Sequence, residues 1–95
     1  MEIINELSHK DKCKKIYTNA LKEIQTFAGD FNWDDFSEDT SKSLRELHQI
    51  VENKFERALT KDIPISSLER ELEVYKQRFK IAIQAVKIKK QIGLF

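Results

Sequence analysis

Three acidic or amide side chains near the middle of this sequence have the spacing of metal ligands. Asp30, Asn32 and Asp34 match the first three ligand positions of a helix-loop-helix calcium site. The match ends there, because Asp35 stands where the sharp turn of such a site needs glycine and Ser41 stands where a bidentate glutamate closes it. We therefore interpret these residues as an exposed acidic loop with helix-capping groups, and we predict no calcium site.

The remaining metal-binding or nucleophilic side chains are few and scattered. His48 and Glu52 lie one helical turn apart and could contact one metal ion together, but His9 is the only other histidine and two ligands fall short of a zinc site. The single cysteine, Cys13, falls on an apolar helix face and is interpreted as a core residue. The sequence also lacks a Ser-His-Asp set and a glycine-rich phosphate loop. We predict no enzyme activity, no metal ion and no cofactor.

Charge is distributed unevenly along the chain, although the formal net charge is only +1. Residues 29–41 contain acids but no lysine or arginine: Asp30, Asp34, Asp35, Glu38 and Asp39. Residues 74–95 contain bases but no acid: Lys76, Arg78, Lys80, Lys87, Lys89 and Lys90. We interpret the two segments as meeting at one end of the fold. The alternatives are head-to-tail association, an anionic partner for the basic segment, or a basic partner for the acidic one.

The composition predicts one all-α domain that covers residues 1–95. Two glycines and one proline leave few turns, and charged residues of both signs make up 35% of the sequence, which is typical of long helices. The apolar runs are shorter than the roughly 20 residues that span a bilayer. Glu2, Glu6 and Lys10 interrupt any signal-peptide-like run at the N-terminus. With the lone cysteine, these features predict a cytoplasmic protein.

Capping residues divide the chain into three predicted helices. A first helix over residues 9–28 ends at Gly29, and Ser37 caps a second helix over about residues 38–61. The third helix is expected over residues 65–95, and Ser66 with the glutamate three residues later forms the capping box at its start. Because the connections are short, we predict an antiparallel three-helix bundle with an overhanging C-terminal helix.

The third predicted helix has apolar residues on two opposite sides, at about 100° per residue. The stripe that closes the core consists of Leu68, Leu72, Tyr75, Phe79, Ile83 and Val86. The second stripe consists of Val74, Ile81, Ala85, Ile88, Ile92 and Phe95. A lone bundle needs only one such stripe, so the second predicts contact with a further surface. Whether residues 1–7 cover it within the same chain stays open at the level of the sequence.

The second stripe predicts that the protein binds another protein or a second copy of itself. The expected contact residues are Ile81, Ile88, Ile92 and Phe95, helped by Phe31 or Trp33 from the loop before the second helix. Electrostatic steering is expected from one row of cations, Lys76, Lys80 and Lys87. The helical residues would then supply most of the affinity, and the lysines would orient the partner on approach.

Two other classes of function use the same helix. A nucleic-acid-associated protein would use the lysine row against phosphates, although Glu69 and Glu73 continue that row and no aromatic residue interrupts it. A peripheral membrane protein would lay the basic amphipathic tail on lipid, where its short apolar face predicts weak binding. Nucleic acid is the alternative prediction, and membrane contact comes third.

From residue 44 onward the sequence resembles class IIa bacteriocin immunity proteins, which are small cytoplasmic helical bundles of Gram-positive bacteria. The residues that carry the resemblance are Leu44, Leu47, Val51 and Phe55, then Asp62, Ile63 and Pro64, then Leu68, Leu72 and Tyr75. The resemblance implies protection of a bacteriocin-producing cell, with the C-terminal part of the bundle recognising a complex of bacteriocin and membrane receptor. The family resembles a four-helix bundle with a further C-terminal segment, so no residue roles are transferred to this chain.

Overall fold

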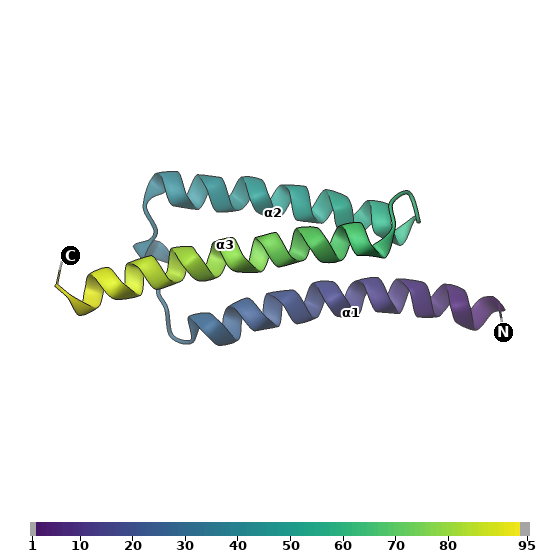
Figure 1. Ribbon diagram of the computed structural model, residues 1–95, viewed down its shortest axis with the longest axis horizontal. Coiled ribbons are helices and arrows are strands. Elements are labelled where there is room, and N and C mark those ends of the chain that lie inside the picture. The colour runs from purple at the N-terminus through teal and green to yellow at the C-terminus, as the bar shows by residue number, and fades with distance from the viewer. Residues whose placement is uncertain (1, 94–95) are drawn as a thin grey trace.

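The computed structural model describes the backbone of residues 2–93 and the side chains of residues 9–93. Its helices are α1 (Glu2–Ala28), α2 (Glu38–Leu59) and α3 (Ile65–Gln91), with a short 3-10 turn, η1 (Trp33–Asp35), between the first two. No strand occurs in the described part of the chain. The predicted all-α bundle of three antiparallel helices is therefore confirmed (Figure 1).

The bundle is elongated, with α3 packed against both other helices. Its principal extents are 58 × 22 × 17 Å. In Figure 1, α3 runs between α1 and α2, and its C-terminal end continues beyond the connection that joins those two helices. The predicted overhang of α3 is therefore present. None of the helices, over the residues that can be described, combines the length and apolar character needed to cross a lipid bilayer.

Helix α1 begins seven residues earlier than the sequence predicted, at Glu2 rather than residue 9. The segment before Ser8 contains no glycine or proline, so its backbone continues the helix instead of turning at a cap. The other end is as predicted, because Gly29 has the positive φ of 61° that a helix-terminating glycine adopts. Ser37 also caps α2 as predicted, accepting a hydrogen bond from the Thr40 N–H at 3.2 Å.

Helix α3 begins at residue 65 as predicted, but its predicted cap and its predicted C-terminal end need correction. The Ser66–Glu69 capping box does not start the helix, since Pro64, two residues earlier, is the N-cap residue and makes no side-chain capping hydrogen bond. Ile63 and Ile65 pack against the core on either side of Pro64. At the other end α3 stops at Gln91, because Gly93 turns the chain with a φ of 70°.

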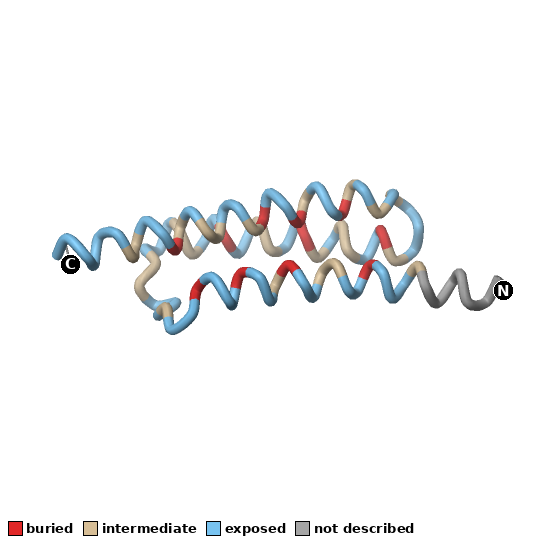
Figure 2. The backbone as a smooth tube through the Cα atoms, turned by 60° about the horizontal axis from the view of Figure 1, so that its bottom comes forward, coloured by how far each residue is buried: buried red, intermediate tan, exposed pale blue. Residues whose placement is uncertain are grey.

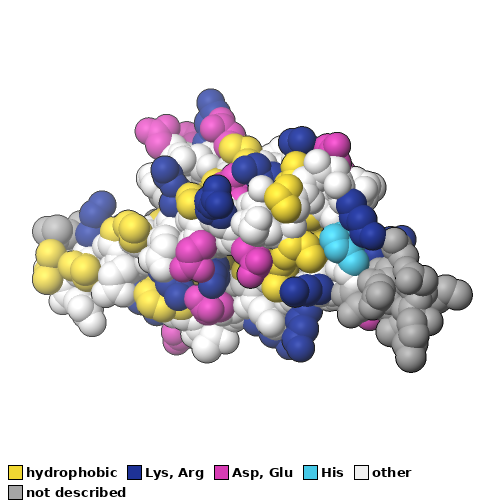
Figure 3. Space-filling model, turned by 45° about the vertical axis from the view of Figure 1, so that its right-hand side comes forward, with side chains coloured by type: hydrophobic (Ala, Val, Ile, Leu, Met, Phe, Trp, Pro, Cys, Tyr) yellow, Lys and Arg dark blue, Asp and Glu magenta, His cyan; other side chains and the backbone are white. Residues whose placement is uncertain are grey.

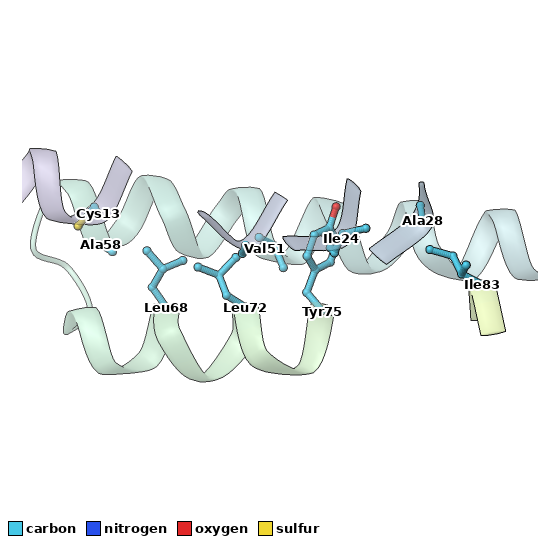
Figure 4. Close-up of a cluster of buried hydrophobic side chains, with 10 residues drawn as sticks. Cys13, Ile24, Ala28, Val51, Ala58, Leu68, Leu72, Tyr75 and Ile83 are labelled. Carbon is cyan, nitrogen blue, oxygen red and sulfur yellow. The ribbon is translucent and has the colours of Figure 1, made fainter. Parts of the chain in front are cut away.

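The core is a single cluster of apolar side chains between the three helices. Its buried members are Cys13, Ala20, Ile24, Ala28, Val51, Ala58, Leu68, Leu72, Tyr75 and Ile83, most of them labelled in Figure 4. The prediction that Cys13 is a core residue is confirmed. At the end of α1 the buried position is Ala28, and the neighbouring Phe27 is 37% exposed. Figure 2 shows α3 continuing as an exposed segment beyond its last buried position.

Candidate interaction surface

Four apolar side chains form an exposed line along the outer side of α3, which we call the outer stripe. The stripe consists of Val74, Ile81, Ile88 and Ile92, whose exposed fractions are 40%, 67%, 46% and 63%. The last three confirm the exposure expected from the sequence. Their spacing of seven and four residues keeps them on one face of the helix. By contrast Ile83, only two positions after Ile81, is fully buried. Figure 3 shows hydrophobic side chains on the projecting end of α3.

A groove between α2 and α3 adjoins the outer stripe. It has a volume of about 410 Å³ and is lined by Thr40, Ser43 and Leu44 from α2 and by Arg78, Ile81 and Ala82 from α3. Leu44 is buried and forms part of the floor, whereas Ile81 stands at the exposed side. The groove meets the outer stripe at Ile81, and we call the two together the docking face.

The predicted steering lysines point to the other side of α3, where α1 packs. Lys80 Nζ donates a hydrogen bond to Glu23 Oε2 at 2.7 Å. Lys76 Nζ lies 3.0 Å from Glu73 Oε2 and 3.5 Å from Glu23 Oε1. The hydrogen bond from Lys80, together with the positive charge of Lys76, lowers the pKa of Glu23 from its ordinary value. Lys76 and Lys80 are thus paired with acids of the same chain.

Lys87, the third predicted steering residue, is also engaged within the chain. Its Nζ donates a hydrogen bond to the Phe27 carbonyl oxygen at 3.2 Å, one of the carbonyls at the C-terminal end of α1. The same ammonium group lies 5.5 Å from the centroid of the Phe27 ring, within range of a cation–π interaction. Lys76, Lys80 and Lys87 therefore fasten α3 to α1.

The acidic loop and the basic end of α3 meet, as one interpretation of the sequence expected. Lys90 forms an ion pair with Asp35 of η1, and Asp35 is half-buried. Arg78 and Lys89, in contrast, have no acidic partner among the described residues. From residue 76 onward the cations of α3 thus fall into two groups, one paired with α1 or the loop and one, Arg78 and Lys89, without an acidic partner among the described residues.

Of the loop aromatics, Phe31 and Phe36 pack against the core, and Trp33, which is 45% exposed, contacts these two rings. Phe31 contacts Trp33 and Phe36 with ring centroids 5.6 and 5.0 Å apart, and Trp33 contacts Phe79 at 6.1 Å. Phe79 belongs to the core-facing stripe, so these rings cover the end of the bundle. None of these ring contacts involves a residue of the outer stripe, which Phe31 or Trp33 was expected to join.

Trp33 borders a second cavity, of about 330 Å³, on a different side of Leu44 from the groove. Its lining residues are Trp33, Phe36, Ser41, Leu44, Arg45, His48, Tyr75 and Phe79. The predicted contact residues are therefore divided: Ile81, Ile88 and Ile92 share one surface, and Trp33 lies at another. Phe95 falls outside the described residues.

His48 is partly buried and lies beside the core residue Tyr75. Its Nδ1 is hydrogen-bonded to Tyr75 Oη at 2.8 Å, and its Nε2 lies 2.7 Å from Glu52 Oε1. Burial, with smaller effects from Tyr17 and Glu52, raises the pKa of Tyr75 to about 12, so this hydroxyl stays protonated. Among the side chains of residues 9–93, no three histidine, cysteine or acidic groups lie close enough to hold a metal ion.

Sequence reasoning missed the α2 side of the docking face and its unpaired cations. Arg78 precedes Ile81 by three residues, a spacing that places both on neighbouring parts of the helix surface. This spacing could have indicated that Arg78 lies beside the exposed isoleucine. Thr40 and Ser43 gave no comparable signal, because only the packing of α2 against α3 brings them beside Ile81.

Comparison with known proteins found no relative of this chain. No family model matches it, and no curated protein or solved structure matches it either.

Proposed function

We propose that this protein is a small helical module that binds another protein through its docking face. The observation that carries the proposal is the line of isoleucines at positions 81, 88 and 92, each with about half or more of its surface exposed. Exposed apolar surface of this extent is costly in water, and burying it favours association by about 25 cal/mol for each Å² removed from water. The apolar line therefore supplies a driving force for binding.

The shape of the docking face fits a helix better than an extended strand. Ile81, Ile88 and Ile92 recur at helical spacing along α3, and Ile81 also lines the groove that contains Leu44. An amphipathic helix packs its own apolar side chains into such a groove at positions i, i+3, i+4 and i+7. The described residues offer no unpaired strand edge that an extended peptide could extend.

Within this proposal, an immunity, inhibitor or accessory role suits a module that acts by binding to another protein. The resemblance of residues 44–75 to class IIa bacteriocin immunity proteins supports the immunity form of that role, in which the bundle recognises a complex of bacteriocin and receptor. The cytoplasm is the proposed compartment, and the buried unpaired thiol of Cys13 supports it. The immunity role and the cytoplasmic compartment are refinements of the binding proposal, and both depend on it.

A synthetic helix can take the place of the natural partner in a test of the proposal. The probe is a fluorescently labelled peptide with leucines at helical spacing on one face and glutamines elsewhere, followed by fluorescence anisotropy. We expect saturable binding to the native protein. Ile81→Asp with Ile88→Asp should weaken that binding at least about tenfold, because two apolar contacts are replaced by charges that must be desolvated.

The control keeps the same chemistry on another helix. Thr18 and Gln25 are exposed on α1 and are separated by seven residues, as are Ile81 and Ile88. Thr18→Asp with Gln25→Asp should bind the peptide with native affinity, and circular dichroism should show native helix content for both double variants. Equal loss of binding in both, or none in either, would contradict the docking face as the site.

A further inference from the structure

The charges of α3 are sorted by side, and the sorting bears on the chemistry of the partner. Beyond Glu73 the helix contains no acid, so from residue 74 onward every charge that α3 itself carries is positive. Lys76, Lys80, Lys87 and Lys90 are engaged with α1 or with the loop. Arg78 and Lys89 are exposed and have no acidic partner among the described side chains. The docking face therefore presents apolar surface bordered by uncompensated positive charge.

These two cations lie close to the isoleucines. Arg78 lines the groove together with Ile81. Lys89 directly follows Ile88 and precedes Ile92 by three residues, a spacing that makes neighbours on a helix surface. A partner seated on the outer stripe would bring its own flanking side chains to both. Acids on those flanks would pair with Arg78 and Lys89, whereas bases would be repelled.

Building on the proposed function, we infer that the occupant of the docking face is an acidic amphipathic helix of a different protein. Its apolar face packs on the outer stripe, and its glutamates or aspartates lie beside Arg78 and Lys89. A second copy of this chain fits less well, because two outer stripes packed together would bring the unpaired cations of both copies into one interface. The complementary charges orient the partner and raise its association rate more than its affinity.

The test compares peptides that differ only in the charge of their flanks. An acidic peptide and a basic peptide carry the same leucine face, with glutamate or lysine at the flanking positions, and both are titrated at low and at physiological salt. At low salt the acidic peptide should bind about tenfold more tightly than the basic one, and added salt should narrow the difference.

Charge reversal then assigns the preference to named residues. Arg78→Glu with Lys89→Glu should reverse the order, so that the basic peptide binds more tightly. The control reverses Lys15 and Lys22, which are exposed on α1 and have no ion pair among the described residues. Lys15→Glu with Lys22→Glu changes the net charge by the same amount and should leave the preference for the acidic peptide in place.

The outcomes separate this inference from the proposed function. Equal affinity for both peptides, abolished by Ile81→Asp with Ile88→Asp, overturns the acidic partner and leaves the docking face standing. Failure of every peptide to bind overturns both proposals. Sedimentation of the native chain as a dimer that Ile81→Asp with Ile88→Asp returns to monomer identifies a second copy as the occupant, and it likewise overturns the acidic partner.

Discussion

Both sides of α3 carry positive charge in the sequence, but the cations facing α1 are paired within the chain, whereas those on the outer side have no acidic partner among the described residues. On the side facing α1, Lys76 and Lys80 both reach Glu23. On the outer side, Ile81 and Ile88 face solvent and the neighbouring Arg78 has no acidic partner among the described residues. The comparison teaches that the lysines are paired within the bundle, whereas the surface left over for a partner is mainly apolar.

The largest expected difference is in stability between two isoleucines on the same helix. Ile83 is fully buried and Ile81 is 67% exposed. Ile83→Ala should lower the free energy of unfolding by about 2–5 kcal/mol, since it leaves a cavity in the core. Ile81→Ala should change it by less than about 0.5 kcal/mol. Urea denaturation of both variants measures the contrast, and similar losses would show that Ile81 is packed in solution.

A smaller effect should appear when the α1-facing side is weakened by acid. Glu23 has a lowered pKa, chiefly because Lys80 donates a hydrogen bond to it, so its ion pairs stabilise the fold above the ordinary pKa of 4.5. This stabilisation is lost as the pH falls through the lowered pKa of the folded state. Glu23→Gln should therefore be less stable than the native protein at neutral pH, and the difference should disappear in acid. Thermal denaturation across that pH range gives the result; a constant difference would contradict the ion-pair account.

The smallest expected effect is local, at the end of α3. Asp35→Asn removes the ion pair with Lys90, and such a partly exposed pair contributes only about 0–1 kcal/mol. We expect faster amide exchange in residues 87–91, with unchanged exchange around Ile83 in the core. Hydrogen–deuterium exchange resolves the two regions. Unchanged exchange at the helix end would mean that the pair does not hold it in solution.

The arrangement of the helices could be predicted largely because its determinants are local. Gly29 ends α1 and Ser37 caps α2 through contacts within one or two turns, which residue type and spacing specify. The cap residue of α3 was misplaced for the opposite reason. The Ser66–Glu69 pattern is a local signal, but packing of Ile65 against the distant core outweighed it.

The candidate surface divides in the same way between predictable and unpredictable parts. The outer stripe follows from the period of a single helix, so its exposed isoleucines could be named in advance. The ion pairing of the lysine row could not be predicted, because Lys80 pairs with an acid that is 57 positions away in the chain. That contact depends on how α1 is rotated against α3. The period of α3 contains no information about this rotation.

Amide NMR spectra of the native chain, recorded while the leucine-faced peptide is added, test the central claim most directly. We predict that shift changes concentrate on the outer side of α3 from residue 74 to residue 92 and on α2 around residues 40–44, where the groove lies. The α1-facing lysines and the solvent side of α1 should change little. Shift changes centred on the cavity beside Trp33, or on α1, would contradict the assignment of the docking face.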